Sequence, residues 1–159
     1  MKGESKTMSP EEKLKSLGFD LKPRESFAPA MAIGKIAGNL LYLSGATPPD
    51  KDGKPWVGRV GETYSVEEGY EAARLTAVAQ LEMAWTVLGD LGRIKQVVKV
   101  LGMVNCVPGF TDTPAVMHGF SDLYLEVLGE KGKHARSAVG LQALPGNTPI
   151  EVETIFEIE

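Results

Sequence analysis

The residues best suited to chemistry in this sequence lie near its C-terminus. Arg136 stands among small residues, and Glu151, Glu153 and Glu157 follow at regularly spaced positions of the last run. A guanidinium group matches a carboxylate in two parallel hydrogen bonds, and a placed carboxylate can move a proton to or from water. The pattern predicts either a ligand site on Arg136 or a cross-strand salt bridge between Arg136 and one of these glutamates.

The segment that carries these residues, 134–159, reads as two alternating runs separated by a turn region rich in Pro, Gly and Asn. Side chains of a strand point alternately to its two faces. The first run therefore places Ala135, Ser137, Val139 and Leu141 on one face, and Arg136, Ala138 and Gly140 on the other. In the second run Ile150, Val152, Phe156 and Ile158 share a face, and the glutamates share the opposite one. Together the two runs predict a strand pair with one polar face.

Helix and strand signals precede this segment in a regular order. Ser9-Pro10 predicts a short helix that stops at Gly18, and Ser65-Val-Glu-Glu68 is a capping box that opens the strongest helix. Thr113-Pro114 predicts a threonine-capped helix that ends at Gly129. Strands are expected within 32–44 and 94–107. This order predicts an α+β fold, a mixed β-sheet with two main helices packed on one face plus a short N-terminal helix.

The chain length suits one domain, so we expect a disordered tail at residues 1–8 and a single domain over residues 9–159. The strand around Leu40–Leu43 and much of 94–107 are apolar at successive positions. Strands of this kind are covered on both faces. Two helices on one face leave the other to be buried elsewhere, which favours an oligomer.

Composition narrows the function classes. The net charge is −4 and no basic cluster is visible, so a nucleic-acid partner is not expected. The single Cys106 excludes an internal disulfide and is expected to be a buried, inert thiol, and His118 and His134 alone do not make a metal site. No apolar run reaches membrane-spanning length and no signal peptide is apparent, so the expected location is cytoplasmic and no membrane partner is expected.

Several other residues allow two interpretations. Ser44 and Gly45 end a buried strand, where small residues permit close approach of a ligand or form a simple turn. Trp56 lies in a loop and either packs against a neighbouring chain, which we favour, or clamps a ligand. Asn105 either satisfies backbone groups at a strand end, the favoured interpretation, or faces a pocket. His118 is expected to be a boundary residue of its helix.

The stretch Ala135-Arg-Ser-Ala-Val-Gly-Leu-Gln-Ala-Leu-Pro145, followed by Ile150-Glu-Val-Glu153, closely resembles the C-terminal signature of the Rid/YjgF family of reactive-intermediate deaminases. Leu43-Ser-Gly45 resembles the strand-end Ser-Gly pair of that family. The resemblance runs from about residue 32 to the end of the chain. It implies a chorismate-mutase-like fold and a homotrimer whose sheets pack inward, with pockets between subunits.

The resemblance also implies an activity. Well-studied members of the family hydrolyse 2-imino or enamine acids to 2-keto acids and ammonia, without a cofactor. By resemblance, Arg136 would bind the carboxylate of a small metabolite and Glu151 would position or activate water. Ser44 and Gly45 correspond to the strand-end pair, and Ala138 to a residue that offers its backbone to the substrate.

Two departures from the family pattern indicate a divergent subgroup. No tyrosine stands near Met31 and Ala32, and the apolar Met117 falls near a position where imine deaminases carry asparagine. Without these two polar side chains, the pocket is expected to be more apolar than that of the imine deaminases. Two further functions stay open: a non-catalytic trimer that binds or senses keto acids, and, less favoured because of the acidic charge balance, an endoribonuclease.

Overall fold

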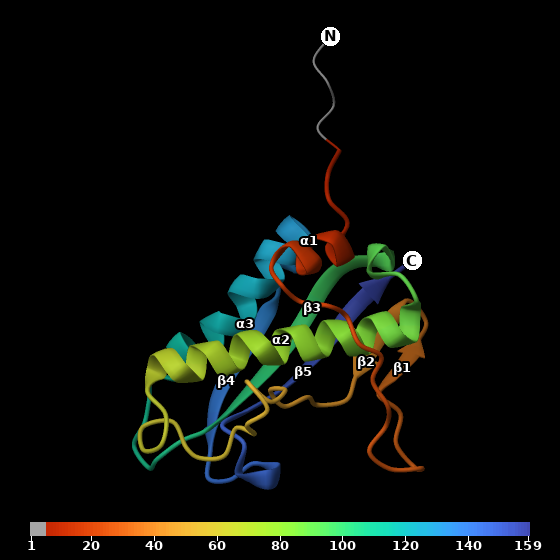
Figure 1. Cartoon of the computed structure of the whole chain (residues 1–159). Helices are drawn as coiled ribbons and strands as arrows, with labels where there is room; N and C mark the ends of the chain where they lie inside the picture. The colour runs from red at the N-terminus through yellow and green to blue at the C-terminus, as the bar shows by residue number, and fades with distance from the viewer. Residues whose placement is uncertain (1–5) are drawn as a thin grey trace.

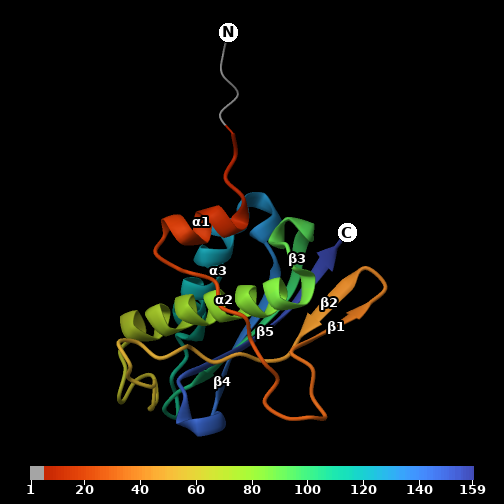
Figure 2. The ribbon, with the colours of Figure 1, turned by 45° about the vertical axis from the view of Figure 1, so that its right-hand side comes forward.

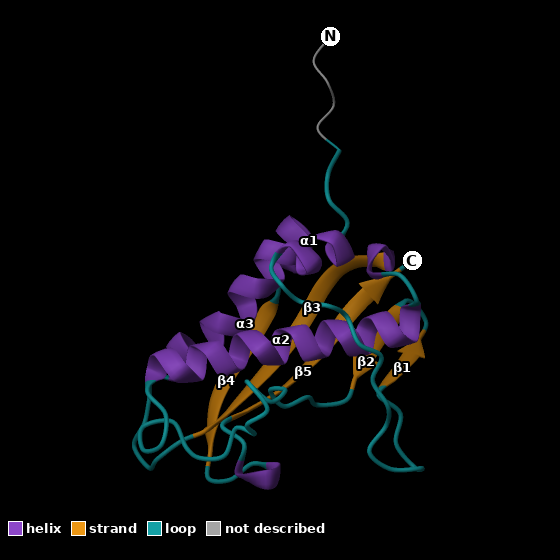
Figure 3. Cartoon of the chain, in the orientation of Figure 1, coloured by secondary structure: helices purple, strands orange, loops and turns teal. Residues whose placement is uncertain are grey.

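The computed structural model describes residues 6–159, in which two long helices lie across one face of a five-stranded sheet (Figures 1 and 3). The predicted mixed sheet with its helices on one face is confirmed. The disordered tail expected at residues 1–8 falls mostly on residues 1–5, outside the described part. The elements are α1 (Pro10–Ser16), β1 (Gly34–Ala37), β2 (Leu40–Leu43), α2 (Val66–Leu88), β3 (Ile94–Asn105), α3 (Thr113–Leu128), β4 (Ala135–Leu141) and β5 (Ile150–Ile158), with short 3₁₀ turns at Leu91–Arg93, Gly129–Gly132 and Pro145–Asn147. Within residues 6–159, no helix has the length and apolar character needed to cross a membrane.

The strands are ordered β1-β2-β5-β3-β4, so β3 lies between the two C-terminal strands. The strand pair predicted from the alternating runs is therefore wrong: β4 runs parallel to β3 after the α3 crossover, and β5 pairs antiparallel with β3 on its other side. β5 is the central strand of the sheet. This position is explained by the apolar residues on its helix-facing side, which are almost completely buried. β4 is left as an edge strand with one neighbour.

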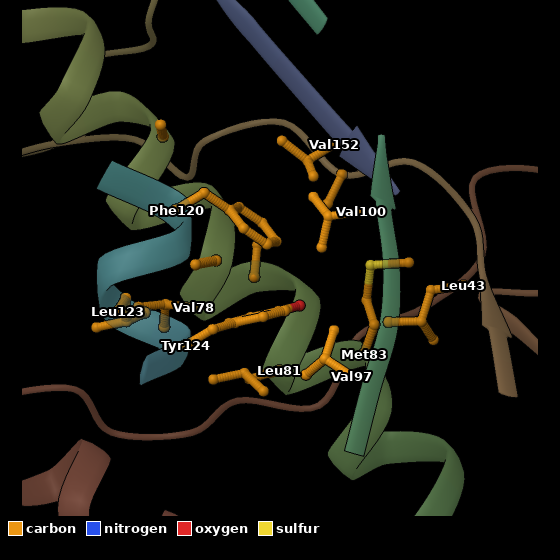
Figure 4. Packing of buried hydrophobic residues seen from close by; sticks show 14 of the residues in the cluster. Leu43, Val78, Leu81, Met83, Val97, Val100, Phe120, Leu123, Tyr124 and Val152 are labelled. Atoms are coloured by element: carbon orange, nitrogen blue, oxygen red, sulfur yellow. The ribbon is translucent and has the colours of Figure 1, made fainter. Parts of the chain in front are cut away.

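The core fills the space between the sheet and the two helices (Figure 4). Tyr124 and Phe120 of α3 point toward the sheet, where Val100 and Val152 meet them, and all four side chains are fully buried. The hydroxyl of Tyr124 lies 2.9 Å from Oγ1 of the buried Thr154, which gives this polar group a partner inside the core. Burial raises the pKa of Tyr124, so the phenol stays protonated.

Local signals set the starts of two helices as predicted. Ser9 and Ser65 both form capping boxes, in which the serine oxygen accepts from an amide three residues later and a glutamate accepts from the cap amide. The predicted threonine cap of α3 is wrong. The N-cap is Asp112, and the hydroxyl of Thr113 instead donates to the carbonyl oxygen of Ala138 at 3.0 Å. This side chain ties the start of α3 to the edge strand β4.

Within the described part of the chain, no helix covers the second face of the sheet. Figure 2 shows the helices gathered on one side of the strands. On the opposite face Tyr42 is 44% exposed and Val139 is 39% exposed, and Met103 and Ile155 are half-buried. Residues 6–159 thus supply the predicted cover on one face only. We use the name open face for this side of the sheet.

α2 and α3 approach each other closely at Gly119. A Cβ atom at this position would collide with the backbone carbonyl oxygen of Tyr70 in α2. Glycine is a poor helix former, and its presence inside α3 is explained by this backbone contact. At Gly69 of α2, by contrast, a Cβ atom would meet only methyl groups of Val116 and Val60, at 3.1 and 3.2 Å.

We predict that Gly119→Ala destabilises the protein by about 3 kcal/mol or more, because two backbones would have to separate in a packed interior. Helix propensity alone predicts the opposite, a gain of about 1 kcal/mol. Gly69→Ala is the matched control and should cost less than about 1 kcal/mol, since side-chain methyl groups can shift. Urea unfolding measures both values. Equal losses in the two variants would contradict the proposed role of the Gly119 contact.

Candidate functional site

Arg136 lies on β4 with its side chain on the helical side of the sheet. Its Nη1 atom donates to Oγ of Ser121 at 3.0 Å and to Nδ1 of His118 at 3.3 Å, both on α3. No carboxylate among residues 6–159 lies within ion-pair distance of the guanidinium, and Nε and Nη2 find no acceptor there. Two parallel N–H groups are therefore free to receive a planar anion such as a carboxylate.

The surroundings of Arg136 form a hollow of about 430 Å³, a volume within the usual range for small-molecule sites. Burial lowers the pKa of Arg136 and the nearby Asp122 opposes this shift. Arginine nevertheless keeps its charge at neutral pH, so the hollow contains a half-buried cation with no paired anion within the described chain. Its lining consists of His118, Ser121, Asp122, Leu125, Gly132, Lys133, His134 and Arg136.

Sequence reasoning missed the polar partners of Arg136. His118 was expected to be a boundary residue, but its exposed side chain lies against the guanidinium. Met117, which falls near the asparagine position of the family, is fully buried in the core. His118 thus supplies the polar group beside Arg136. The spacing of His118 and Ser121, three residues apart on one helix, places both on one face and was the available signal.

Glu151 of β5 lies on the open face, against Gly45. A Cβ atom at Gly45 would stand 2.5 Å from Oε1 of Glu151, so the absence of a side chain makes room for the carboxylate. Burial raises the pKa of Glu151, and the charge of Glu153 adds to this effect. A carboxylate with a raised pKa is a better proton acceptor, as general-base catalysis requires. Gly45 thus leaves room for the Glu151 side chain, and its expected role beside a ligand stays a prediction.

Ser44 is fixed by its neighbours. Its hydroxyl donates to the carbonyl oxygen of Ala32 at 2.7 Å, and its own carbonyl oxygen accepts from Nε2 of the buried Gln80 at 2.9 Å. These bonds hold the strand end next to Gly45 in place. In the described chain, Ser44 serves to position the backbone beside Glu151.

Ala138 presents its backbone at the free edge of β4. The carbonyl oxygen of Leu141 points to the β3 side, where it accepts from the amide of Cys106 at 3.4 Å. Because backbone groups alternate along a strand, the amide of Ala138 points away from β3, on the side where Thr113 meets its carbonyl oxygen. The predicted backbone role of Ala138 is compatible with this position and stays a prediction.

Arg136 and Glu151 lie on opposite faces of the sheet. Arg136 is in register with Val100, whose side chain is buried under the helices. Glu151 pairs with Met103, which is three residues further along β3 and therefore on the other face. This excludes the intrachain salt bridge considered from sequence. The predicted residues form two groups: Arg136 and Ala138, which with the newly found His118 and Ser121 we call the arginine half, and Glu151, Ser44 and Gly45, which we call the glutamate half.

Three other side chains have partners within the chain, and whether Trp56 also contacts a neighbouring chain or a ligand stays a prediction. The ring of Trp56 packs against Tyr64, with 5.2 Å between ring centroids. Asn105 is fully buried and its Nδ2 donates to the carbonyl oxygen of Thr148 at 3.1 Å, which satisfies backbone as expected. Cys106 is buried, and burial raises the pKa of its thiol. None of these three side chains belongs to either half of the candidate site.

The fold and the C-terminal pattern agree with comparisons to known proteins. The family described as "YjgF/chorismate mutase-like, putative endoribonuclease" matches residues 12–157, nearly the whole chain. The protein therefore belongs to the YjgF/Rid family, and its fold is chorismate-mutase-like. The family membership confirms the resemblance found in the C-terminal stretch.

Individual relatives support the same assignment. Protein TCP17 of Trypanosoma cruzi is 38% identical over 146 residues, which is 91% of each chain. The structure of protein Atu1372 from Agrobacterium tumefaciens is 40% identical, with a TM-score of 0.85 over 94% of this chain and 92% of that one. A protein of Shewanella oneidensis, described as a "putative endoribonuclease", is 30% identical, with a TM-score of 0.89 over 95% of this chain and 100% of that one.

The hydrogen bond from Thr113 to Ala138 gives a stability prediction for the edge of the arginine half. Thr113→Val keeps the shape of the side chain but leaves the Ala138 carbonyl oxygen without this donor. We expect a loss of about 1–2 kcal/mol in urea unfolding. Thr113→Ser is the control, because it retains the hydroxyl and should lose less. A Thr113→Val protein as stable as the wild type would show that this bond does not stabilise the β4 edge.

Proposed function

We propose that this protein hydrolyses 2-imino or enamine acids to 2-keto acids and ammonia. The observation that carries the proposal is the half-buried guanidinium of Arg136, whose Nε and Nη2 have no acceptor among residues 6–159. An unpaired buried cation costs free energy unless a ligand neutralises it. A substrate carboxylate meets this need in a fork of two charge-assisted hydrogen bonds.

The chemistry requires one water molecule and one proton acceptor. In the proposed reaction Glu151 takes a proton from water as the oxygen attacks the carbon of the protonated imine, and a tetrahedral carbinolamine forms. Glu151 then passes this proton to the nitrogen, the carbon–nitrogen bond breaks and ammonia leaves, and the hydroxyl proton returns to Glu151 as the carbonyl forms. Burial raises the pKa of Glu151, which favours its role as the base. Holding both reactants in place supplies further rate enhancement.

The two halves of the site would come from different subunits. Arg136 stands on the free edge strand β4, and Glu151 stands on the open face of the sheet. We propose a homotrimer in which the open faces pack inward, so that the arginine half of one chain meets the glutamate half of its neighbour. The exposed apolar side chains of Tyr42 and Val139 on the open face support such packing.

A second candidate function is binding without turnover. It needs only the arginine half, which is assembled within one chain, and it does not need Glu151. In this alternative the protein senses or sequesters keto acids or similar metabolites. The family description mentions ribonuclease activity, but a net charge of −4 gives little attraction for RNA, and we expect no RNA cleavage by this chain.

The substrate role of Arg136 predicts a large kinetic effect. Imines are generated in situ by an amino-acid oxidase, and ammonia release above the spontaneous rate is measured. Arg136→Ala should lower kcat/KM about 100-fold, the equivalent of losing one bidentate ion pair. Arg74→Ala is the control, because Arg74 carries the same charge on α2 and pairs with Glu126 instead. Equal rates for wild type and Arg136→Ala would refute the proposed mechanism.

A shared site between subunits predicts complementation. Arg136→Ala and Glu151→Gln should each be inactive alone. When the two variants are unfolded together and refolded as a mixture, about a quarter of the interfaces combine an intact arginine with an intact glutamate. We therefore expect about a quarter of wild-type activity in the mixture and none in either variant refolded alone. An inactive mixture that is shown by mass spectrometry to contain mixed trimers would exclude a site shared in this way.

A further inference from the structure

A chain of hydrogen bonds lies behind Arg136. Nδ1 of His134 is 2.6 Å from the carbonyl oxygen of Gly132, so this nitrogen carries a proton and donates it. In the neutral ring Nε2 is then an acceptor, and Oγ of Ser121 lies 2.9 Å from it. The hydroxyl of Ser121 donates its only proton to His134. Its lone pairs are left for Arg136, whose Nη1 donates at 3.0 Å.

The direction of this chain depends on a neutral His134. Burial lowers the pKa of His134, and the charge of Arg136 lowers it further, whereas the hydrogen bond to Gly132 raises it. The ring also meets Tyr124 edge-on, with 5.9 Å between centroids. The other charged or titratable groups of the hollow are His118, Asp122 and Lys133.

We propose that Ser121 and His134 are positioning residues that hold Arg136 so that only its Nε–Nη2 edge faces the ligand. Both hydrogens of Nη1 are engaged, one by Ser121 and one by His118. A ligand must then present two coplanar oxygen atoms to the side of the guanidinium. This selects a carboxylate in one orientation and directs the rest of the substrate along a single path. The inference deepens the proposed function and rests on its assignment of Arg136 as the carboxylate receptor.

The arrangement also couples ligand binding to a proton. A carboxylate bound to Arg136 cancels the positive charge that helps to keep His134 unprotonated. The pKa of His134 therefore rises when the ligand binds, and the protein takes up protons in slightly acidic solution. This linkage requires only that the His134 ring lies close enough to Arg136 to be affected by its charge.

The test is calorimetric titration of the full chain with pyruvate, the smallest 2-keto acid. Ser121→Ala and His134→Leu should each weaken binding about tenfold, because a charge-oriented hydrogen bond is lost. Ser121→Thr keeps a hydroxyl, and His134→Gln keeps an acceptor for it, so both should bind close to wild type. Ser137→Ala is the matched control, since Ser137 is adjacent to Arg136 but points to the other face and accepts from Lys99.

Proton uptake is measured by repeating the titration at about pH 6 in two buffers of different ionisation enthalpy. The wild type should take up protons on binding and His134→Gln should not. Wild-type affinity in Ser121→Ala, or proton uptake that persists in His134→Gln, would overturn the inference. If the wild type binds pyruvate but releases no ammonia from imines, the catalytic proposal fails and this inference stands. If the wild type releases ammonia from imines but does not bind pyruvate, the catalytic proposal stands and this inference fails.

Discussion

The placement of α3 depends on two contacts that leave no room for a side chain. On one side its Gly119 meets the backbone of Tyr70 in α2, and on the other its Met117 lies over Gly102 of β3, where a Cβ atom would stand 2.5 Å from the methionine Cε. Between and beside these contacts α3 carries His118 and Ser121. The polar partners of Arg136 are thus fixed by the same close packing that builds the core. A shift of α3 would disturb the hollow as well as the fold.

Local features of the fold could be predicted because their causes are local. The capping boxes at Ser9 and Ser65 involve atoms within four residues of each other, and the helical stripes and strand alternation follow from fixed periods. The order of strands could not be predicted in the same way. The turn between β4 and β5 suggested a hairpin, but both strands pair with β3, the longest strand of the sheet, and not with each other. The predicted capping role of Thr113 was wrong for a similar reason, because the hydrogen-bond partner of its hydroxyl lies on β4, far away in sequence.

In the candidate site, too, features with local causes could be predicted and features with tertiary causes could not. Alternation along β4 gave the face of Arg136 relative to Val139, and alternation along β5 gave the face of Glu151 relative to Val152. Alternation did not show whether Arg136 and Glu151 share a face, because it relates side chains only within one strand and not between two strands. Only the shared register on β3, through Val100 and Met103, reveals that the two side chains lie on opposite faces. The spacing of Ser121 and His118 showed that they share a helix face, but only tertiary packing brings Ser121 and His134 to the arginine.

The separation of Arg136 from Glu151 has a chemical consequence. On one face of a single chain these two groups would form an ion pair, which would neutralise the carboxylate receptor and lower the pKa of the base. Placed on opposite faces, each keeps the property that the proposed hydrolysis requires: Arg136 retains a fork without a partner among residues 6–159, and Glu151 retains a raised pKa. Should the halves meet between subunits, the substrate carboxylate would occupy the fork. The arginine would then be neutralised by the substrate, and Glu151 would remain available to water.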